Sequence, residues 1–208
     1  MFTLSESFCT AVEKIIDEIE AKSDVEIVVV FSRKSAEYLD IPWKLSVALC
    51  WLLMCLLFLL DFRPTLGALC IDLPIILYGG QWIIHKVPSF WRHLITKKRK
   101  LAHVQKSAAA AFQAEKIYGS PHRNGILIYL SALEDRIEVL LDGGLWGKLP
   151  LVDIQTLAWK SQSDDPHLLG STDDFLKSLR ELGDLCTQHH PLKREKINHI
   201  PNAVRVLS

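Results

Sequence analysis

The sequence predicts an α/β fold in which one small domain is interrupted by a two-helix transmembrane hairpin. Three observations lead to this prediction: two adjacent long apolar runs, short aliphatic runs of strand length, and amphipathic helical patterns on either side of them. We therefore expect residues 1–40 to form the first part of a cytoplasmic domain. Residues 41–92 should form the hairpin, and residues 93–208 should complete the domain.

The first part of the domain is expected to contain a helix and then a strand. Within Ser5–Ala21 the apolar side chains recur at helical spacing. These side chains are Phe8, Val12, Ile15, Ile16 and Ile19. The run Asp24–Phe31 follows, rich in β-branched residues and nearly continuously apolar at its end. This pattern is typical of a strand covered on both faces, as in a central parallel pair.

The hairpin is predicted from two apolar runs separated by a short break. Leu45–Leu60 contains no charged residue, and Thr65–Ile84 contains only Asp72. A spanning helix needs about 20 residues, with a minimum of roughly 17. Because Trp43 and Lys44 extend the first run, spans are expected at about 43–60 and 65–84. The alternative, two buried helices of a soluble core, fits less well because a core helix normally keeps a polar face.

Asp72 stands out because a carboxylate within hydrocarbon is costly and by default suggests a function. In one interpretation Asp72 lies in the outer third of the span, either protonated or bonded to a neighbouring helix. In another it contacts a second copy or a partner protein, and we favour this contact over a proton relay. Two helices cannot enclose a transport pathway by themselves.

The charges flanking the hairpin predict its orientation. The connecting loop has one basic residue, Arg63, whereas many lie on the side of both hairpin ends. These are Arg33, Lys34, Lys44, Lys86, Arg92, Lys97, Lys98, Arg99 and Lys100. An excess of basic residues marks the cytoplasmic side, so both termini are expected in the cytoplasm. An aromatic belt at that face is expected from Trp43, Tyr78, Trp82 and Trp91.

The basic run 97–100 could also be interpreted as a nucleic-acid patch. Its position just beyond a membrane helix favours contact with anionic lipid instead. The chain has 24 basic and 24 acidic residues, and this balance argues against a protein that coats nucleic acid.

The second part of the domain is expected to supply the remaining strands. Lys98–Tyr118 has a helical pattern, and the runs 125–131 and 136–142 form a probable β-hairpin around residues 132–135. A right-handed crossover would make the strands at 24–31 and 125–131 parallel neighbours. Two further helices are expected, at residues 151–160 and 171–190.

These segments, in their order, resemble the TPM domain family, in its branch of small bacterial membrane proteins with a transmembrane hairpin inside the domain. The resemblance extends from about Ser5 to Leu207. The matching pieces are Val25–Val30, Val104, Ala108, Phe112, Arg123–Ser131, Glu134–Asp142, Trp159 and Asn198–Asn202. It implies a three-layer α/β/α sandwich around a small sheet, in a two-pass protein of the bacterial cytoplasmic membrane. Most of the family has no defined biochemical role. A thylakoid-lumen relative is associated with photosystem II repair and described as an acid phosphatase, and some members bind calcium.

No catalytic or cofactor-binding residue is predicted, because no GxSxG, HExxH, P-loop or GxGxxG motif occurs. The metal candidates are Asp24, Asp142 and Asp153, which stand at a strand start, at a strand end and in the opening of a helix. Calcium, which takes six to eight oxygen ligands, is the candidate ion. The alternative is that Asp142–Gly144 is only a turn and Asp153 only a cap. Gly144–Lys148 replaces the extended glycine-rich loop of soluble relatives, and this departure argues against a transferred phosphatase site.

Two functions are therefore expected, and the first is preferred. In the first, we expect the chain to be a non-enzymatic module that binds or helps assemble other membrane proteins, or itself, at the cytoplasmic face of the bilayer. In the alternative it is a metal-dependent phosphomonoesterase.

Overall fold

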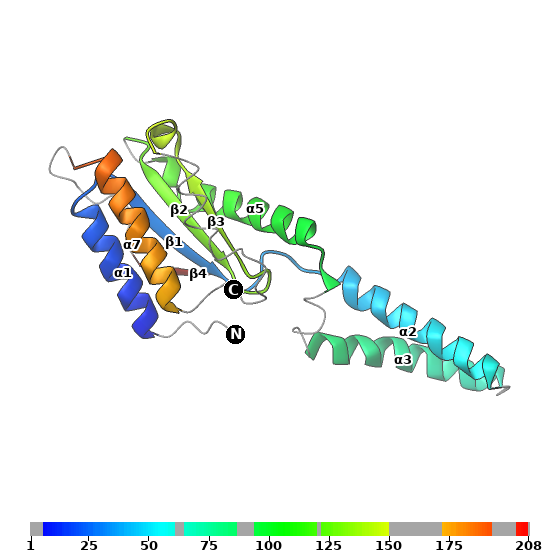
Figure 1. Ribbon diagram of the computed structural model, residues 1–208. Helices are drawn as coiled ribbons and strands as arrows, with labels where there is room; N and C mark the ends of the chain where they lie inside the picture. Colours follow the sequence, from blue (N-terminus) through cyan, green and yellow to red (C-terminus); the bar gives the residue numbers. More distant parts are fainter. Residues whose placement is uncertain are drawn as a thin grey trace. The chain divides into compact units, whose positions relative to one another are not determined.

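The computed structural model describes most of the chain, namely residues 6–60, 65–86, 94–119, 122–149, 172–192 and 203–207. The chain divides into two compact units. An α/β unit contains residues up to Ala36 and from Leu101 onwards, and a hairpin unit contains Glu37–Lys100 (Figure 1).

The α/β unit is built on a four-stranded sheet with the order β3-β2-β1-β4. The strands are β1 (Glu26–Ser32), β2 (Gly125–Ser131), β3 (Arg136–Leu141) and β4 (Arg205–Leu207). β1 runs parallel to β2 and to β4, whereas β2 and β3 form an antiparallel pair. The parallel pairing of the first two strands and the following β-hairpin are thus confirmed. β4 was not predicted from the sequence.

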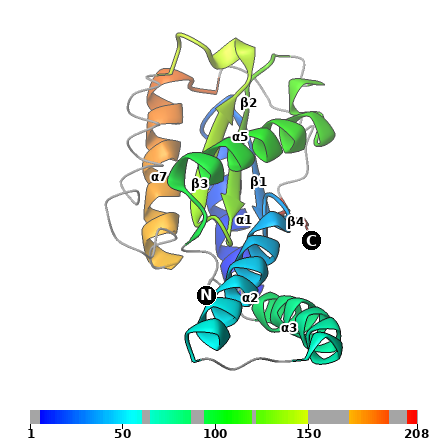
Figure 2. The ribbon, with the colours of Figure 1, turned by 90° about the vertical axis from the view of Figure 1, so that its right-hand side faces the viewer.

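Helices cover both faces of this sheet, which makes three layers (Figures 1 and 2). One face carries Ile27, Val29 and Ile128, among others, and packs against α1 (Glu6–Glu20) and α7 (Thr172–His189). The other face carries Val28, Val30, Leu127 and Tyr129 and packs against α5 (Lys97–Ala114). Because successive residues of a strand point to opposite faces, β1 supplies both cores. All seven of its residues are buried, as its near-continuous apolar pattern predicted.

The helices of this unit follow the predicted patterns closely. α1 buries the five apolar residues of its stripe, and α7 carries Asp173 and Asp174 in its first turn, near the positive end of the helix. α5 ends at Ala114, and a short 3-10 turn, η2 (Ile117–Gly119), follows. The helix predicted at residues 151–160 lies outside the described residues.

The hairpin unit contains the helices α2 (Asp40–Leu59) and α3 (Leu66–Lys86), at about the residues predicted for the two spans. The spans themselves stay a prediction. The helices pack near the start of α2 and the end of α3. There the ring of Trp43 meets that of Tyr78 edge-on at 6.4 Å between centroids. Ser46 of α2 lies against Gly80 of α3, and a Cβ added to Gly80 would stand 3.3 Å from the Oγ of Ser46. Small residues at such crossings let two helix backbones approach each other closely. The loop residues 61–64 and Trp91 lie outside the described residues.

Candidate functional site

Asp142 ends β3 and caps the 3-10 turn η3 (Gly143–Leu145). Its Oδ1 accepts a hydrogen bond from the amide of Gly143 at 2.6 Å, and its own amide donates to the carbonyl of Gly125 at 2.9 Å. The residue is only 6 % exposed. Its Oδ2 is buried and has no hydrogen-bond partner within the described part of the chain. Asp142 therefore sits in the capped turn that the alternative interpretation expected, and one oxygen atom is left over.

Glu26 is the nearest comparable acid on the same face of the sheet. The strand register places Glu26 of β1 opposite Gly125 of β2. On the other side of Gly125 lies Asp142, directly after β3. Glu26 is 2 % exposed, and its Oε2 also has no partner among the described residues. Adjacent strands lie about 4.8 Å apart, so the backbones of the two acids are separated by about 10 Å. The side chain of Ile117 covers Gly125 between them, where an added Cβ would collide with its Cγ2. The two acids therefore do not share a ligand position.

Asp24 lies in the turn between α1 and β1, and its described contacts are made by its backbone. Its amide donates to the carbonyl of His190 at 3.1 Å, and its carbonyl accepts a hydrogen bond from the side-chain amide of Asn124. Asp153 lies outside the described residues. Within the residues described, no three His, Cys, Asp or Glu side chains gather closely enough to hold a metal ion. The site formed by Asp24, Asp142 and Asp153 stays a prediction.

Gly144, the second glycine after Asp142, is explained by packing in this structure. The amide of Gly144 donates to the carbonyl of Arg123 at 2.9 Å. A Cβ at Gly144 would collide with that carbonyl and with the carbonyl of His122. The close approach of these two backbone segments explains the glycine without invoking a bound phosphate.

Glu134, which the sequence analysis did not single out as a site residue, organises a buried polar cluster beside the ends of β1 and β2. Both of its carboxylate oxygens accept from the amide of Ser35, at 3.0 and 3.1 Å, and its Oε2 also accepts from the hydroxyl of Ser131. Ser35 donates its hydroxyl to Ser131 at 2.8 Å, while its carbonyl accepts from Ser107 of α5 at 2.7 Å. These bonds fix the segment after β1 directly before the α/β unit ends at Ala36. An acid in a β-hairpin loop is ordinarily solvated, so the sequence carried no signal for this role.

A second charged cluster lies in the hairpin unit, at the start of α2. Arg99 donates two hydrogen bonds to the carboxylate of Asp40, at 2.6 and 2.8 Å, and Lys44 donates one at 3.0 Å. The hydrogen bonds to the Asp40 carboxylate raise the pKa of Arg99. The guanidinium also lies over the ring of Tyr38, 5.2 Å from its centroid.

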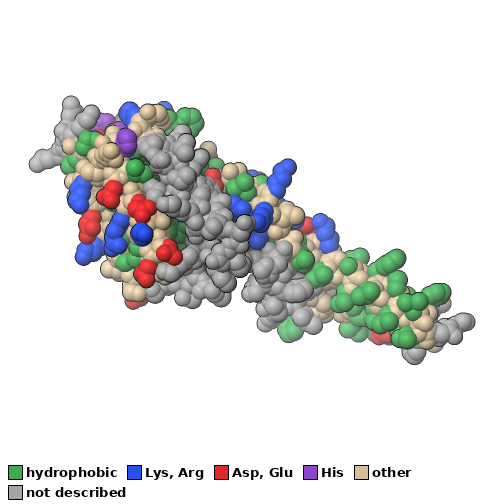
Figure 3. Space-filling view, in the orientation of Figure 1, with side chains coloured by type: hydrophobic (Ala, Val, Ile, Leu, Met, Phe, Trp, Pro, Cys, Tyr) green, Lys and Arg blue, Asp and Glu red, His purple; other side chains and the backbone are tan. Residues whose placement is uncertain are grey.

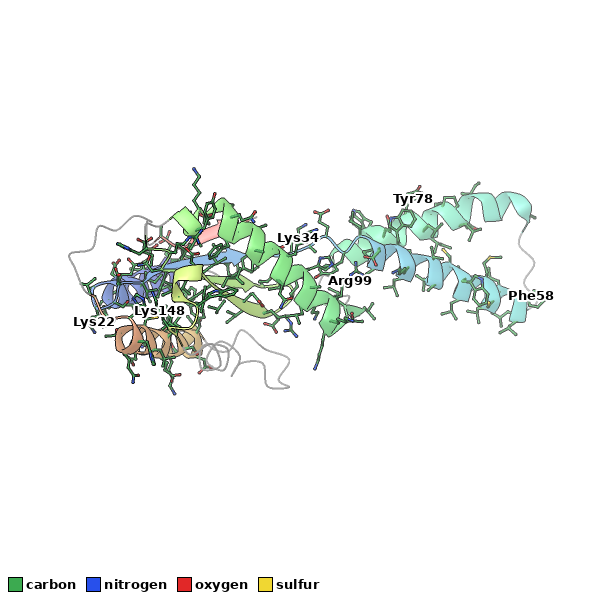
Figure 4. All side chains as sticks on the ribbon, turned by 90° about the horizontal axis from the view of Figure 1, so that it is seen from above. Lys22, Lys34, Phe58, Tyr78, Arg99 and Lys148 are labelled. Carbon is green, nitrogen blue, oxygen red and sulfur yellow. The ribbon has the colours of Figure 1, made fainter. Side chains whose placement is uncertain are left out.

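A cleft of about 390 Å³ adjoins this cluster. Its charged and polar lining comes from Asp40, Lys44, Thr96 and Arg99. Figure 4 labels Arg99 on the ribbon. The rest of the lining is apolar and consists of Ile41, Leu45, Ala48, Leu94 and Ile95. The sequence analysis grouped Arg99 with its basic neighbours and did not connect it with Asp40.

Large apolar side chains are exposed along the hairpin. On α2, Trp51 is 73 %, Leu59 79 % and Phe58 86 % exposed. On α3, Tyr78 is among the exposed residues; Phe58 and Tyr78 are labelled in Figure 4. Hydrophobic side chains gather over this hairpin in Figure 3, whereas acidic and basic groups dominate the described surface of the α/β unit. By length and composition alone, α2 is the one helix in the described ranges that could cross a membrane.

Asp72 is exposed on α3, two residues before Pro74. Since proline has no amide hydrogen, the carbonyl four residues earlier loses its usual helical partner. Two polar groups thus occur close together in an otherwise apolar helix.

Comparisons with known proteins identify the fold. No family model matches the sequence, and a search of curated proteins found no match. Among solved structures, the chain is similar to the NMR structure of BA42 protein from the psychrophilic bacterium Bizionia argentinensis, with a TM-score of 0.57. The likeness covers 99 % of this chain and 96 % of that one, at 14 % sequence identity. The TM-score and the coverage show a shared α/β fold, and at this low identity the likeness shows the fold alone.

Proposed function

We propose that this chain is a two-pass membrane protein whose α/β unit binds or helps assemble other membrane proteins at the cytoplasmic face. The observation that carries the proposal is the exposed apolar surface of α2, which includes Trp51, Phe58 and Leu59. A patch of this kind on a water-soluble protein marks a surface that something else covers. A bilayer suits it, because α2 is 20 residues long and has exposed apolar side chains along its length.

Charge and resemblance support the orientation and the membrane. Basic residues flank both ends of the hairpin, so both termini are assigned to the cytoplasm. The segments Val25–Val30, Arg123–Ser131 and Glu134–Asp142 resemble the TPM domain family, and the fold likeness to BA42 protein agrees with an α/β sandwich of that kind. On this basis we propose membership of the membrane branch of that family and a place in the bacterial inner membrane.

Topology can be tested with reporter fusions in a bacterial host. Alkaline phosphatase, which is active outside the cytoplasm, is fused after Arg63, and green fluorescent protein is fused after Ser208. We expect phosphatase activity from the first fusion and fluorescence from the second. The opposite pattern, or a protein that alkaline carbonate removes from membranes, would contradict the proposal.

The assembly role rests on the scaffold itself. Glu134 accepts from the amide of Ser35, the next-to-last residue of the first α/β segment, so this segment is held in place up to the point where the hairpin unit begins. Crosslinking in native membranes followed by purification should recover other membrane proteins with this chain. Recovery of the chain alone would reject a role in binding other membrane proteins.

Self-association is a separate form of the same proposal, and Asp72 supports it. An exposed carboxylate on a membrane helix is stabilised by a hydrogen-bonding partner on a neighbouring helix. Asp72→Leu should therefore weaken oligomers in detergent, as measured by light scattering coupled to gel filtration. Asp72→Asn, which keeps a hydrogen-bonding side chain, should largely preserve them, and an oligomer indifferent to both changes would count against the contact.

A metal-dependent phosphomonoesterase is the second candidate, and one observation favours it. Asp142 keeps a buried oxygen without a hydrogen-bond partner among the described residues, and such an oxygen is a potential cation ligand. The test is hydrolysis of a generic phosphomonoester by the purified protein, with and without calcium or magnesium. Turnover that needs metal and is abolished by Asp142→Asn would establish this activity and displace the first proposal.

A further inference from the structure

The cleft at the start of α2 has the lining expected at a membrane surface. One side is charged, with Asp40, Lys44 and Arg99, and the other is apolar, with residues such as Leu45 and Ile95. Its residues come from the first turns of α2 and from the segment that leads into α5. In the proposed topology, this is the level of the lipid headgroups.

The charged side retains hydrogen-bond donors after its internal ion pairs are made. A guanidinium carries five N–H donors and an ammonium three. Asp40 takes two from Arg99 and one from Lys44. Two cations and one carboxylate leave a net charge of about +1, which complements one phosphodiester monoanion. Asp40 thus orients both cations toward the cleft without cancelling their combined charge.

The helix starts favour an anion at the same place. α2 begins at Asp40 without a capping hydrogen bond from the side chain of Leu39, and α5 begins at Lys97. Helix N-termini carry a partial positive charge from their aligned peptide dipoles. This partial charge adds to the charges of Lys44 and Arg99.

The apolar side decides what kind of anion fits. Ile41, Leu45, Ala48, Leu94 and Ile95 offer nothing to a free phosphate ion, which is hydrated on all sides. A phospholipid presents a phosphodiester directly joined to glycerol and acyl chains, so it would use both sides of the cleft.

We propose that this cleft binds one anionic phospholipid, with its phosphodiester on Lys44 and Arg99 and its upper acyl chains against Leu45 and Ile95. The inference rests on the proposed membrane insertion and adds a specific lipid site to it. It also gives Arg99 a role different from that of its neighbours in the basic run, which contribute general surface charge.

Two charge variants and one filling variant test the site, with Lys98→Gln as the matched control. Arg99→Gln removes the bidentate donor, whereas Lys44→Gln leaves the pair between Arg99 and Asp40 intact and so keeps the local fold. Ala48→Phe fills the apolar side without changing charge. Lys98→Gln removes the same charge from an exposed neighbour that does not line the cleft.

The measurement is native mass spectrometry of the full chain in neutral detergent micelles, with added phosphatidylglycerol or phosphatidylcholine. Micelles of neutral detergent remove the general attraction of a charged bilayer. Wild type and Lys98→Gln should retain one phosphatidylglycerol about tenfold more strongly than phosphatidylcholine, because the choline cation offsets the phosphodiester charge and is repelled by Lys44 and Arg99. Arg99→Gln should lose about tenfold in retention, and Lys44→Gln and Ala48→Phe should also weaken it. Equal retention of both lipids, or a loss in Lys98→Gln as large as in Arg99→Gln, would overturn the site.

Two further arms separate the alternatives. Inorganic phosphate added at high concentration should not displace the lipid, and displacement would mean that the cleft recognises phosphate alone. Flotation with pure phosphatidylcholine vesicles tests membrane insertion separately. Flotation without lipid selectivity rejects this site and leaves the proposed function standing, whereas failure to float rejects both.

Discussion

At the scale of single residues, buried carboxylates fix loops and edges of the sheet through backbone amides. Glu134 holds the amide of Ser35, and Asp142 caps the turn after β3. Glu20 accepts from the amide of Ile27 in β1 at 2.9 Å. A hydrogen bond from an amide to a charged acceptor is stronger than one between neutral groups, and a buried amide without a partner is costly. Each of these acids therefore has a structural role, and the sequence alone does not distinguish such acids from functional ones.

Removing the Glu134 carboxylate should loosen the segment after β1. Glu134→Ala leaves the partly buried amide of Ser35 without its acceptor, so we expect the free energy of unfolding to fall by about 1–3 kcal/mol. Glu134→Gln keeps one oxygen acceptor and should cost about half as much. Hydrogen exchange at residues 33–36 measures the local effect. Unchanged exchange in Glu134→Ala would show that the hydrogen bonds to Glu134 do not hold this segment.

Glu138 should make the α/β unit less stable as the pH rises. Burial raises the pKa of Glu138, against a hydrogen bond from Gln105 and the charge of Arg136. Because the folded-state pKa lies above the unfolded one, folding favours the protonated acid. The stabilising contribution is complete below the unfolded-state pKa and is lost as the pH rises through the folded-state pKa.

Glu138→Gln should therefore raise the melting temperature at pH 7 and leave it nearly unchanged at pH 4. The exposed Glu18→Gln provides the matched charge control and should show no such difference between the two pH values. A melting temperature lowered at pH 7 in Glu138→Gln would show that the ionised acid is needed for folding.

At the scale of elements, α1 and α7 pack closely at a glycine. Gly183 of α7 lies against Ile19 of α1, where an added Cβ would collide with Cγ1 of Ile19. Both residues are buried on the side of the sheet that α1 and α7 cover. The two helices therefore approach more closely than a larger residue at position 183 would allow.

Gly183→Ala should destabilise the α/β unit by about 1–3 kcal/mol, because overpacking outweighs the gain in helix propensity. Ile19→Val beside it should recover part of the loss by freeing space. Gly119→Ala is the control, since nothing lies within 4 Å of a Cβ at Gly119. Denaturant unfolding of the full chain in detergent measures these differences. If Gly183→Ala were as stable as Gly119→Ala, the close packing would be refuted.

The elements that could be predicted from the sequence are those with a strong local pattern. α1, β1 and the pair β2–β3 have clear periodicity or continuous apolar runs. The parallel pairing of β1 with β2 followed from chain handedness, and the antiparallel pairing of β2 with β3 from their short connection. β4 has three residues and no pattern of its own. It pairs with the end of β1, and Arg205 in it forms an ion pair with Glu115, so its formation depends on distant partners.

The candidate sites were less predictable for the same reason. Asp142 was recognised as an acid at a strand end, but its burial and its capping bond depend on Gly125 and on the turn beyond it. Asp40 and Arg99 are 59 residues apart in the chain, so no local spacing connects them. Periodicity reports which face of an element is buried, and it does not report which polar groups meet.

At the scale of the whole molecule, the exposed apolar surface of the hairpin separates this chain from an ordinary α/β domain. Only Ile41, Pro42, Ser46 and Cys50 of α2 are buried. The opposite side of the helix carries large exposed apolar residues, including Leu52, which lies near the middle of the predicted span. A charge placed there tests the membrane assignment directly.

Leu52→Arg should reduce insertion, because an arginine at the centre of a spanning helix costs about 2.5–3.5 kcal/mol. Leu52→Ala is the control and should insert almost as wild type does. The fraction of protein in the carbonate-resistant membrane pellet measures insertion. A pellet fraction equal to that of wild type in Leu52→Arg would show that this face of α2 does not meet hydrocarbon.

The parallel pairing of β1 with β2 has a consequence for biosynthesis. The two central strands are separated by about 90 residues of chain. At a translation rate of 5–20 residues per second, β1 leaves the ribosome roughly 5–20 s before its partner is made. During this interval Ile27–Phe31, the apolar stretch of β1, is unpaired while the hairpin is synthesised. The pairing of β1 with β2 can therefore form only after the hairpin has been made, so in the proposed topology the hairpin can meet the membrane before the α/β fold is complete.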